Sequence, residues 1–67
     1  MRLTSDQREA LSIAEQSNRS QPEGMAKWEI AFNDGKTCTM LSDQCRDRVA
    51  AFLASVERFG AQVKAVW

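Results

Sequence analysis

Apolar residues recur at every second position over residues 28–32, where Trp28, Ile30 and Phe32 alternate with polar or small side chains. This two-residue period is typical of a strand that has one buried face. Residues 36–41 alternate in the same way, after a short segment of Asn, Asp and Gly that favours a tight turn. The pattern therefore predicts an antiparallel β-hairpin.

The length of the turn decides the register of this hairpin. A two-residue turn would pair Ile30 with Thr39, whereas a three-residue loop that ends at a left-handed Gly35 pairs Ile30 with Cys38. A slip of one residue moves every side chain of a strand to the other face. The three-residue loop gathers the apolar side chains on one face, so it is the predicted register. That face consists of Trp28, Ile30, Phe32, Cys38 and Met40. The other face consists of Glu29, Ala31, Thr37, Thr39 and Leu41.

Residues 43–59 have the longer period of an amphipathic helix that covers the apolar face of the hairpin. Ser42 is the predicted N-cap, Asp43 lies in the first turn, and Gly60 follows the last turn as a helix-ending glycine. The apolar stripe consists of Cys45, Val49, Phe52, Leu53, Val56 and Phe59. The arginines at 46 and 48 and Ser55 lie outside this stripe, on the face predicted to meet solvent.

A second helix is predicted over residues 5–17, because Thr4 and Gln7 have the spacing of a capping box. Its apolar stripe is narrow and contains no aromatic residue, so two roles stay open. The helix either packs on the rest of the fold or serves as an arm for a partner. Residues 18–27 contain the single proline and a glycine among polar residues, which predicts a flexible loop.

The last segment, residues 62–67, again alternates and predicts a third strand. Val63, Ala65 and Trp67 then lie on one face, and Val66 lies on the other with Lys64. A right-handed crossover through the preceding helix places this strand beside the first one, which gives the sheet order 2-1-3. The alternative is that the helix continues through Gly60 to the end of the chain, since one glycine costs a helix only about 1 kcal/mol.

Together these elements predict a small two-layer α+β domain, α-β-β-α-β, that uses the whole chain from 1 to 67. A core of this size is marginal, and chains below about 70–80 residues usually need a disulfide, a metal or a second subunit. The chain has two cysteines and no histidine, so neither a metal site nor a cofactor site is predicted. Its nine basic and nine acidic residues give no net charge, which favours self-association. We therefore expect a homodimer.

The two cysteines are the best candidates for chemistry. In the predicted fold Cys45 lies in the first turn of the second helix, where a cysteine can act as a thiolate nucleophile or a redox sensor. A nucleophile of that kind needs a base, and the chain has no histidine. Cys38 lies on the apolar face of the hairpin. Both cysteines are predicted to be small buried apolar residues, and no residue is assigned a catalytic role.

Location follows from what the sequence lacks. The N-terminus has no apolar core of a signal peptide, and no apolar run approaches the roughly 18 residues that a membrane-spanning helix needs. The chain is therefore expected in the cytoplasm, without membrane contact, and both cysteines are expected as reduced thiols.

The leading hypothesis is a non-enzymatic protein-interaction or regulatory module. Its size, its balanced charge and its lack of a catalytic motif are typical of small accessory proteins of bacteria and their phages. In the order 2-1-3 the second and third strands have open edges, which can take a strand from a partner. The residues expected to contact a partner are Trp67, Leu41, Val66, Arg46 and Arg48.

The alternative hypothesis is a small regulator that binds DNA or RNA. Lys36, Arg46 and Arg48 would cluster where the second helix begins near the hairpin, and such a patch can contact phosphates. Asp43 and Asp47 lie among these residues and weaken the positive field. Nucleic-acid binding is therefore the less favoured of the two.

Overall fold

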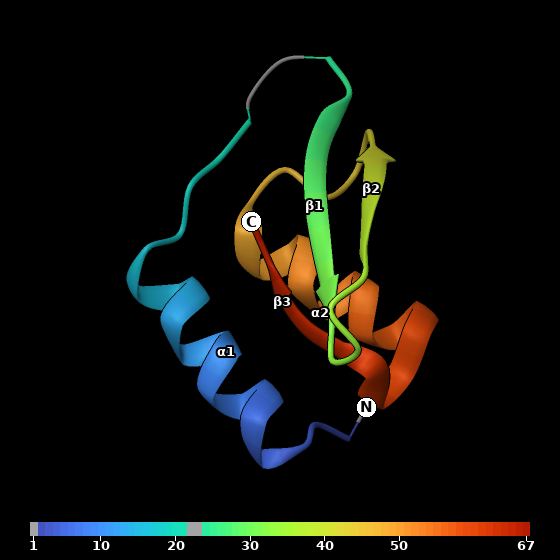
Figure 1. Cartoon of the computed structure of the whole chain (residues 1–67). Helices are drawn as coiled ribbons and strands as arrows, with labels where there is room; N and C mark the ends of the chain where they lie inside the picture. The colour runs from blue at the N-terminus through green and yellow to red at the C-terminus, as the bar shows by residue number, and fades with distance from the viewer. Residues whose placement is uncertain (1, 22–23) are drawn as a thin grey trace.

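Two helices and a three-stranded antiparallel sheet make up the fold in the computed structural model, which describes residues 2–21 and 24–67 (Figure 1). In chain order the elements are α1 (Ser5–Gln16), β1 (Ala26–Phe32), β2 (Thr37–Ser42), α2 (Arg48–Phe59), a 3₁₀ turn (Gly60–Gln62) and β3 (Val63–Val66). The sheet order is β2-β1-β3. The predicted α+β class, the element order and the strand order are all confirmed.

The register of the β1–β2 hairpin is the predicted one. Ile30 lies opposite Cys38, and Trp28 lies opposite Met40. Gly35 ends the loop at φ +88°, a left-handed conformation that glycine adopts without steric cost. The backbone N–H of Lys36 donates to the Asp34 carboxylate at 3.0 Å, which holds the loop from its other side. The choice of register by the apolar pattern is therefore correct.

The helix α2 begins at Arg48, five residues later than the predicted start at 43. Its N-cap is Asp47, whose Oδ1 accepts the backbone N–H of Ala50 at 2.7 Å. Ser42, the predicted N-cap, instead accepts the N–H groups of Gln44 and Cys45 and organises a turn after β2. Ser and Asp are both favoured N-cap residues, so the sequence offered Ser42 and Asp47 as candidates. The prediction of Ser42 was wrong because the helix begins directly after Asp47.

Pairing with the segment after α1 explains this delayed start. The N–H of Gln21 donates to the carbonyl of Arg46 at 2.8 Å, and the N–H of Arg48 donates to the carbonyl of Arg19 at 3.1 Å. Residues 46–47 are thereby held extended. The predicted flexible loop 18–27 includes residues 22 and 23, which lie outside the described residues, and its last two residues belong to β1.

The third strand forms as predicted, and α2 does not continue through Gly60, whose φ is +72°. A β-bulge changes its faces, however. Val66 pairs with Ile30 and Val63 pairs with Phe32, so Lys64 is one residue more than β1 can match. The extra residue puts Val63 and Val66 on the same face. Val66 is therefore buried in the core, and its predicted place on the opposite face of the sheet, with Lys64, is wrong.

The core lies between the sheet and the helices. Its fully buried side chains include those of Trp28, Ile30, Phe52, Val56, Val63 and Val66. The ring of Phe32 meets that of Phe59 edge to face at a centroid distance of 5.3 Å. On α2 the buried face is wider than predicted, since Ser55 and Arg48 are also buried. The reason is that α2 packs against the sheet on one side and against α1 on another.

The helix α1 lies alongside β3 and α2 (Figure 1). Its predicted capping box is present: the N–H of Gln7 donates to Thr4 Oγ1, and the N–H of Thr4 donates to Gln7 Oε1, both at 3.1 Å. Leu3, Ala10 and Leu11 pack against the core from this side. Of the two open roles for this helix, packing on the fold is thus observed. The sheet face that carries Glu29, Thr37, Thr39 and Leu41 is exposed, and neither helix of the described residues lies over it.

Candidate functional site

The outer edge of β3 is occupied by side chains of the two helices. Gln7 Nε2 donates to the carbonyls of Gly60 and Val63, each at 3.0 Å. Arg48 Nε donates to the carbonyl of Val66 at 2.7 Å. These bonds satisfy carbonyl groups that an added strand would need, and α1 lies along the same side. The expectation that both outer strands are open is therefore wrong for β3.

Arg48 does not belong to an exposed arginine face. Its side chain is only 8% exposed, and NH1 donates to Ser17 Oγ at 2.9 Å. Its guanidinium also lies over the ring of Trp67, with Cζ 4.7 Å from the ring centroid. The prediction placed Arg48 toward solvent because it assumed that the helix has one buried face. In the structure α2 has two, one against the sheet and one against α1.

Replacing Arg48 with methionine is expected to lower the free energy of unfolding by about 2 kcal/mol, since the buried carbonyl of Val66 loses its donor. Methionine keeps much of the apolar stem. Urea unfolding of the variant measures the loss. Arg58→Met, at an exposed position of the same helix, is the matched control and is expected to change stability by no more than about 0.5 kcal/mol. Equal effects of the two substitutions would contradict the assigned role of Arg48.

Within residues 2–21 and 24–67 no strand pairs with the outer edge of β2. Lys36, Cys38 and Met40 pair with β1, since the N–H of Phe32 donates to the carbonyl of Lys36 and the register continues from there. In an antiparallel strand the alternate residues direct their N–H and C=O groups to the other side. Those residues are Thr37, Thr39 and Leu41, and all three are exposed.

This edge also lacks the usual protection against strand addition. Natural edge strands carry charges, prolines or bulges that prevent pairing with another chain. The strand Thr37–Ser42 contains no charged residue and no proline, and its pairing with β1 has no bulge. The edge is therefore both unpaired and competent to pair.

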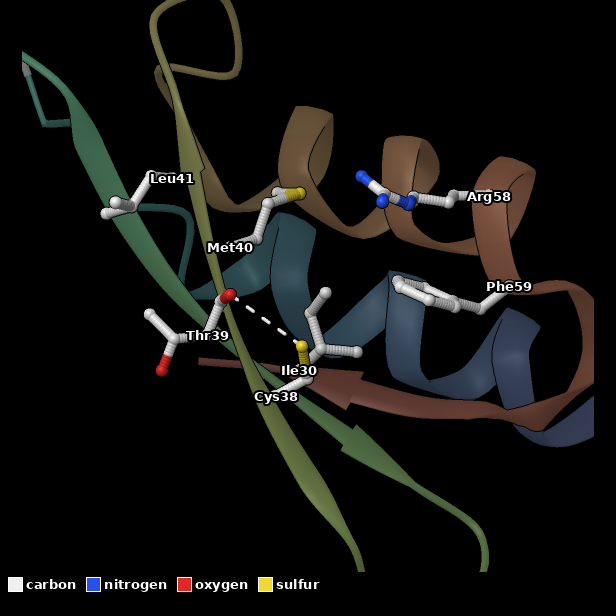
Figure 2. A pocket seen from close by; sticks show the side chains of 7 residues that line it. All are labelled: Ile30, Cys38, Thr39, Met40, Leu41, Arg58 and Phe59. Carbon is white, nitrogen blue, oxygen red and sulfur yellow. Dashed lines mark hydrogen bonds between the residues drawn. The ribbon is translucent and has the colours of Figure 1, made fainter.

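A groove runs between β2 and the end of α2 (Figure 2). Ile30 forms its floor, Cys38 and Met40 line the β2 side, and Arg58 and Phe59 line the α2 side. It exists because α2 packs beneath β3 and β1 and leaves the helix side of β2 partly uncovered. Its volume of about 160 Å³ is small beside the roughly 300–1,000 Å³ of small-molecule pockets, so it suits one or two side chains of a peptide.

The same gap exposes Cys38, which was predicted to be buried. Cys38 does lie on the face shared with Ile30, but at the edge strand no helix covers it. Its Sγ makes a weak contact with the carbonyl of Thr39 at 3.7 Å (Figure 2). Cys45 lies in the turn before α2 rather than in the helix, and it is half-buried. Its carbonyl accepts the indole N–H of Trp28 at 2.9 Å.

The predicted basic cluster does not form. Lys36 lies at the hairpin loop, whereas Arg46 follows β2 at the opposite end of the strand. The NH1 group of Arg46 donates to the carbonyls of Gln21 and Gly24. With Arg48 buried, the three residues offer no common surface. The error arose because helix α2 starts near the open end of the hairpin, not near its loop.

Two of the predicted partner residues are exposed. Leu41 is 63% exposed on the face of the sheet opposite α2, directly beside the outer edge of β2. Trp67 is 56% exposed and lines a hollow between α1 and β3 together with Ile13 and Ala65. Backbone bonds between Trp67 and Glu29, at 2.8 and 3.1 Å, extend the sheet to the last residue. Their roles in binding stay predictions.

Within residues 2–21 and 24–67 no group of three His, Cys, Asp or Glu residues is placed to hold a metal ion. No helix in the described part of the chain has the length and apolar character that a membrane crossing requires. Comparison with protein-family models, with curated protein sequences and with solved structures found no significant match.

Sequence reasoning missed the groove residues Arg58 and Phe59 as a possible contact surface. A signal for the open edge was nevertheless present, since residues 37–42 lack charge and proline although they form an outer strand in the predicted order. For Gln7 and Arg48 there was no such signal, because both act on β3 across more than ten residues of sequence.

Proposed function

We propose that this chain is a small non-enzymatic interaction module that binds another chain by adding a strand to the edge of β2. One observation carries the proposal: the β3 edge is occupied by Gln7 and Arg48, whereas the β2 edge is exposed and uncharged. Main-chain hydrogen bonds to Thr37, Thr39 and Leu41 provide the affinity in this binding mode.

The groove beside β2 gives the mode its selectivity. Every second side chain of an added strand points to the helix side, where Met40 and Phe59 offer apolar contacts. The exposed Arg58 lies at the same groove and favours an acidic or polar group near the hairpin end. The other side chains of the added strand lie on the open face beside Leu41.

A cytoplasmic location belongs to the proposal, because Cys38 is exposed and a reducing compartment keeps it a thiol. An accessory role in bacteria or phages belongs to it as well, on the ground of size and balanced charge. Trp67 is a second exposed anchor that a larger partner can contact. Nucleic-acid binding has no observation in its favour, since Lys36 and Arg46 lie at opposite ends of β2.

The substitution Thr39→Pro tests this function. The N–H of Thr39 points away from β1, so proline there removes one group of the free edge and leaves the backbone bonds of the hairpin intact. Both proline and valine at this position also lose the bond from Thr39 Oγ1 to Glu29. Peptides are first selected for binding to the wild-type protein from a random displayed library. These peptides are expected to bind Thr39→Pro at least about tenfold more weakly, because about one hydrogen bond to the edge is lost. Thr39→Val keeps the backbone and the shape and is the matched control.

Hydrogen exchange locates the bound peptide. The amides of Thr37, Thr39 and Leu41 are expected to exchange quickly in the free protein and to gain protection in the complex. Peptides that bind Thr39→Pro as tightly as the wild type, or that protect other amides, contradict strand addition at β2. The same holds if the library yields no binding peptide.

A further inference from the structure

We infer that the chain which pairs with β2 is a second copy of this protein, joined through β2 of each copy in an antiparallel arrangement with Thr39 on the two-fold axis. The inference rests on the proposed function, since it names the occupant of the same edge. The result is a continuous six-stranded sheet with the helices of both copies on one side.

The register follows from which groups are free. Only pairs between outward-pointing residues form hydrogen bonds, and those residues are Thr37, Thr39 and Leu41. Pairing Thr39 with Thr39 of the second copy places Thr37 opposite the second copy's Leu41. The backbone N–H and C=O groups of all three outward residues then form hydrogen bonds in both copies. Any other two-fold register leaves one or more of them unpaired.

The helix side of the joint strand is compatible with this register. Cys38 of one copy lies opposite Met40 of the other, so two small or flexible apolar side chains meet beside Phe59. Residues 37–42 carry no charge, so the second copy's strand brings no charged side chain into the groove, and Arg58 on the α2 side is exposed. The groove is therefore filled by the second copy's Met40 and Cys38 rather than by a buried charge.

Charge is self-complementary along the strand. The hairpin end of β2 carries Lys36, with Asp34 in the loop before it, and the groove at this side of the molecule carries Arg58. The opposite end leads into Asp43. All four side chains are exposed, and the two basic ones outnumber Asp34 at the hairpin end. Antiparallel pairing brings the basic end of one copy to the acidic end of the other, and symmetry makes this contact twice. A parallel pair of copies would place like charges side by side, whereas the antiparallel pair matches opposite charges at both ends, so this edge is complementary to a second copy of itself.

The affinity is expected to be low. The contact consists of one short strand from each copy, about six hydrogen bonds and little apolar area, which places it among weak and transient interfaces. Zero net charge means that the two copies do not repel each other at long range. A dissociation constant of about 100 μM is therefore expected.

A reciprocal charge exchange tests the pairing. Lys36→Glu alone and Asp43→Lys alone each put like charges at both ends of the joint strand, so each variant is expected to dimerise about tenfold more weakly than the wild type in sedimentation equilibrium. An equimolar mixture of the two variants restores opposite charges at both ends. The mixture is expected to recover dimer formation to near the wild-type level, as heterodimer.

Two controls accompany this experiment. Lys64→Glu alters the net charge as Lys36→Glu does but lies on β3, so its dimerisation is expected to stay at the wild-type level. Thr39→Pro is expected to stay monomeric up to about 1 mM, whereas Thr39→Val keeps the backbone N–H and is expected to dimerise more tightly than Thr39→Pro. Circular dichroism of each variant shows that the fold is retained.

The outcomes separate this inference from the proposed function. A wild-type chain that stays monomeric at about 1 mM, or a mixture of charge variants that does not recover dimerisation, overturns the second copy as the occupant. If library peptides still require the Thr39 N–H in that case, strand addition at β2 stands with a different partner. If dimerisation persists in Thr39→Pro, the copies meet through another surface and the inference fails.

Discussion

Replacing Trp28 with alanine is expected to leave the protein largely unfolded at room temperature. The Trp28 side chain is 0% exposed, and its indole N–H donates to the carbonyl of Cys45 at 2.9 Å. The guanidinium of Arg19 lies over the ring, with Cζ 5.1 Å from its centroid. A buried Trp→Ala substitution costs about 3–5 kcal/mol, and a core of this size rarely provides more than about 3–5 kcal/mol in total.

Circular dichroism at about 25 °C and urea unfolding measure this effect. Leu41→Ala is the matched control, because Leu41 is exposed and its loss is expected to cost no more than about 0.5 kcal/mol. Trp28→Phe keeps most of the apolar area and loses the bond to Cys45, so an intermediate loss of about 2 kcal/mol is expected. If Trp28→Ala unfolded cooperatively in urea at the same midpoint concentration as the wild type, burial of Trp28 would not be needed for the stability of the core.

Replacing Gln7 with glutamate is expected to cost about 3 kcal/mol or more, the second largest effect. The carboxylate keeps an acceptor for the N–H of Thr4 but loses both donors of Nε2. It then faces the carbonyl oxygens of Gly60 and Val63 in a buried position, where a charge has no partner. Helix α1 is therefore expected to detach from β3 or the whole fold to weaken.

Unfolding by urea gives the size of the loss, and hydrogen exchange of the β3 amides shows where it acts. Gln44→Glu, the same change at an exposed position, is expected to alter stability by no more than about 0.5 kcal/mol. If Gln7→Glu and Gln44→Glu behave alike, Gln7 serves only the capping box. A larger loss for Gln7→Glu at high pH than at low pH would agree with a buried carboxylate, since protonation restores a donor.

Much of the fold follows from local patterns in the chain. The alternation of Trp28, Ile30 and Phe32, together with a glycine that can adopt positive φ at the hairpin loop, selected the correct register. The capping box of Thr4 and Gln7 placed the start of α1 correctly. These signals are reliable because each acts between residues close in sequence, where geometry leaves few choices.

The errors share one physical origin, which is contact between distant segments. Helix α2 starts late because residues 46–48 pair with residues 19–21. Val66 is buried because a bulge at Lys64 resets the alternation of β3. Neither the pairing nor the bulge can be seen in the local pattern, since each depends on the position of a segment that is distant in sequence.

The candidate site divides in the same way. The lack of charge and proline over residues 37–42 is a property of the sequence, and the alternation of the hairpin already placed Leu41 on the face opposite the apolar one. The tertiary structure decided that the edge of β2 stays open in the described residues while that of β3 does not, because Gln7 and Arg48 reach across the fold to occupy β3. The position of α2 beneath β3 and β1 likewise created the groove and exposed Cys38.

The sequence by itself therefore determined the elements, their order and the register of the hairpin, since these depend on periodicity and on turn residues. Which buried polar side chains satisfy which carbonyls, and hence which edge of the sheet can still bind, was decided only by the tertiary structure. Hydrogen bonds between residues more than ten positions apart have no period along the chain, and the availability of an edge is a property of the whole fold.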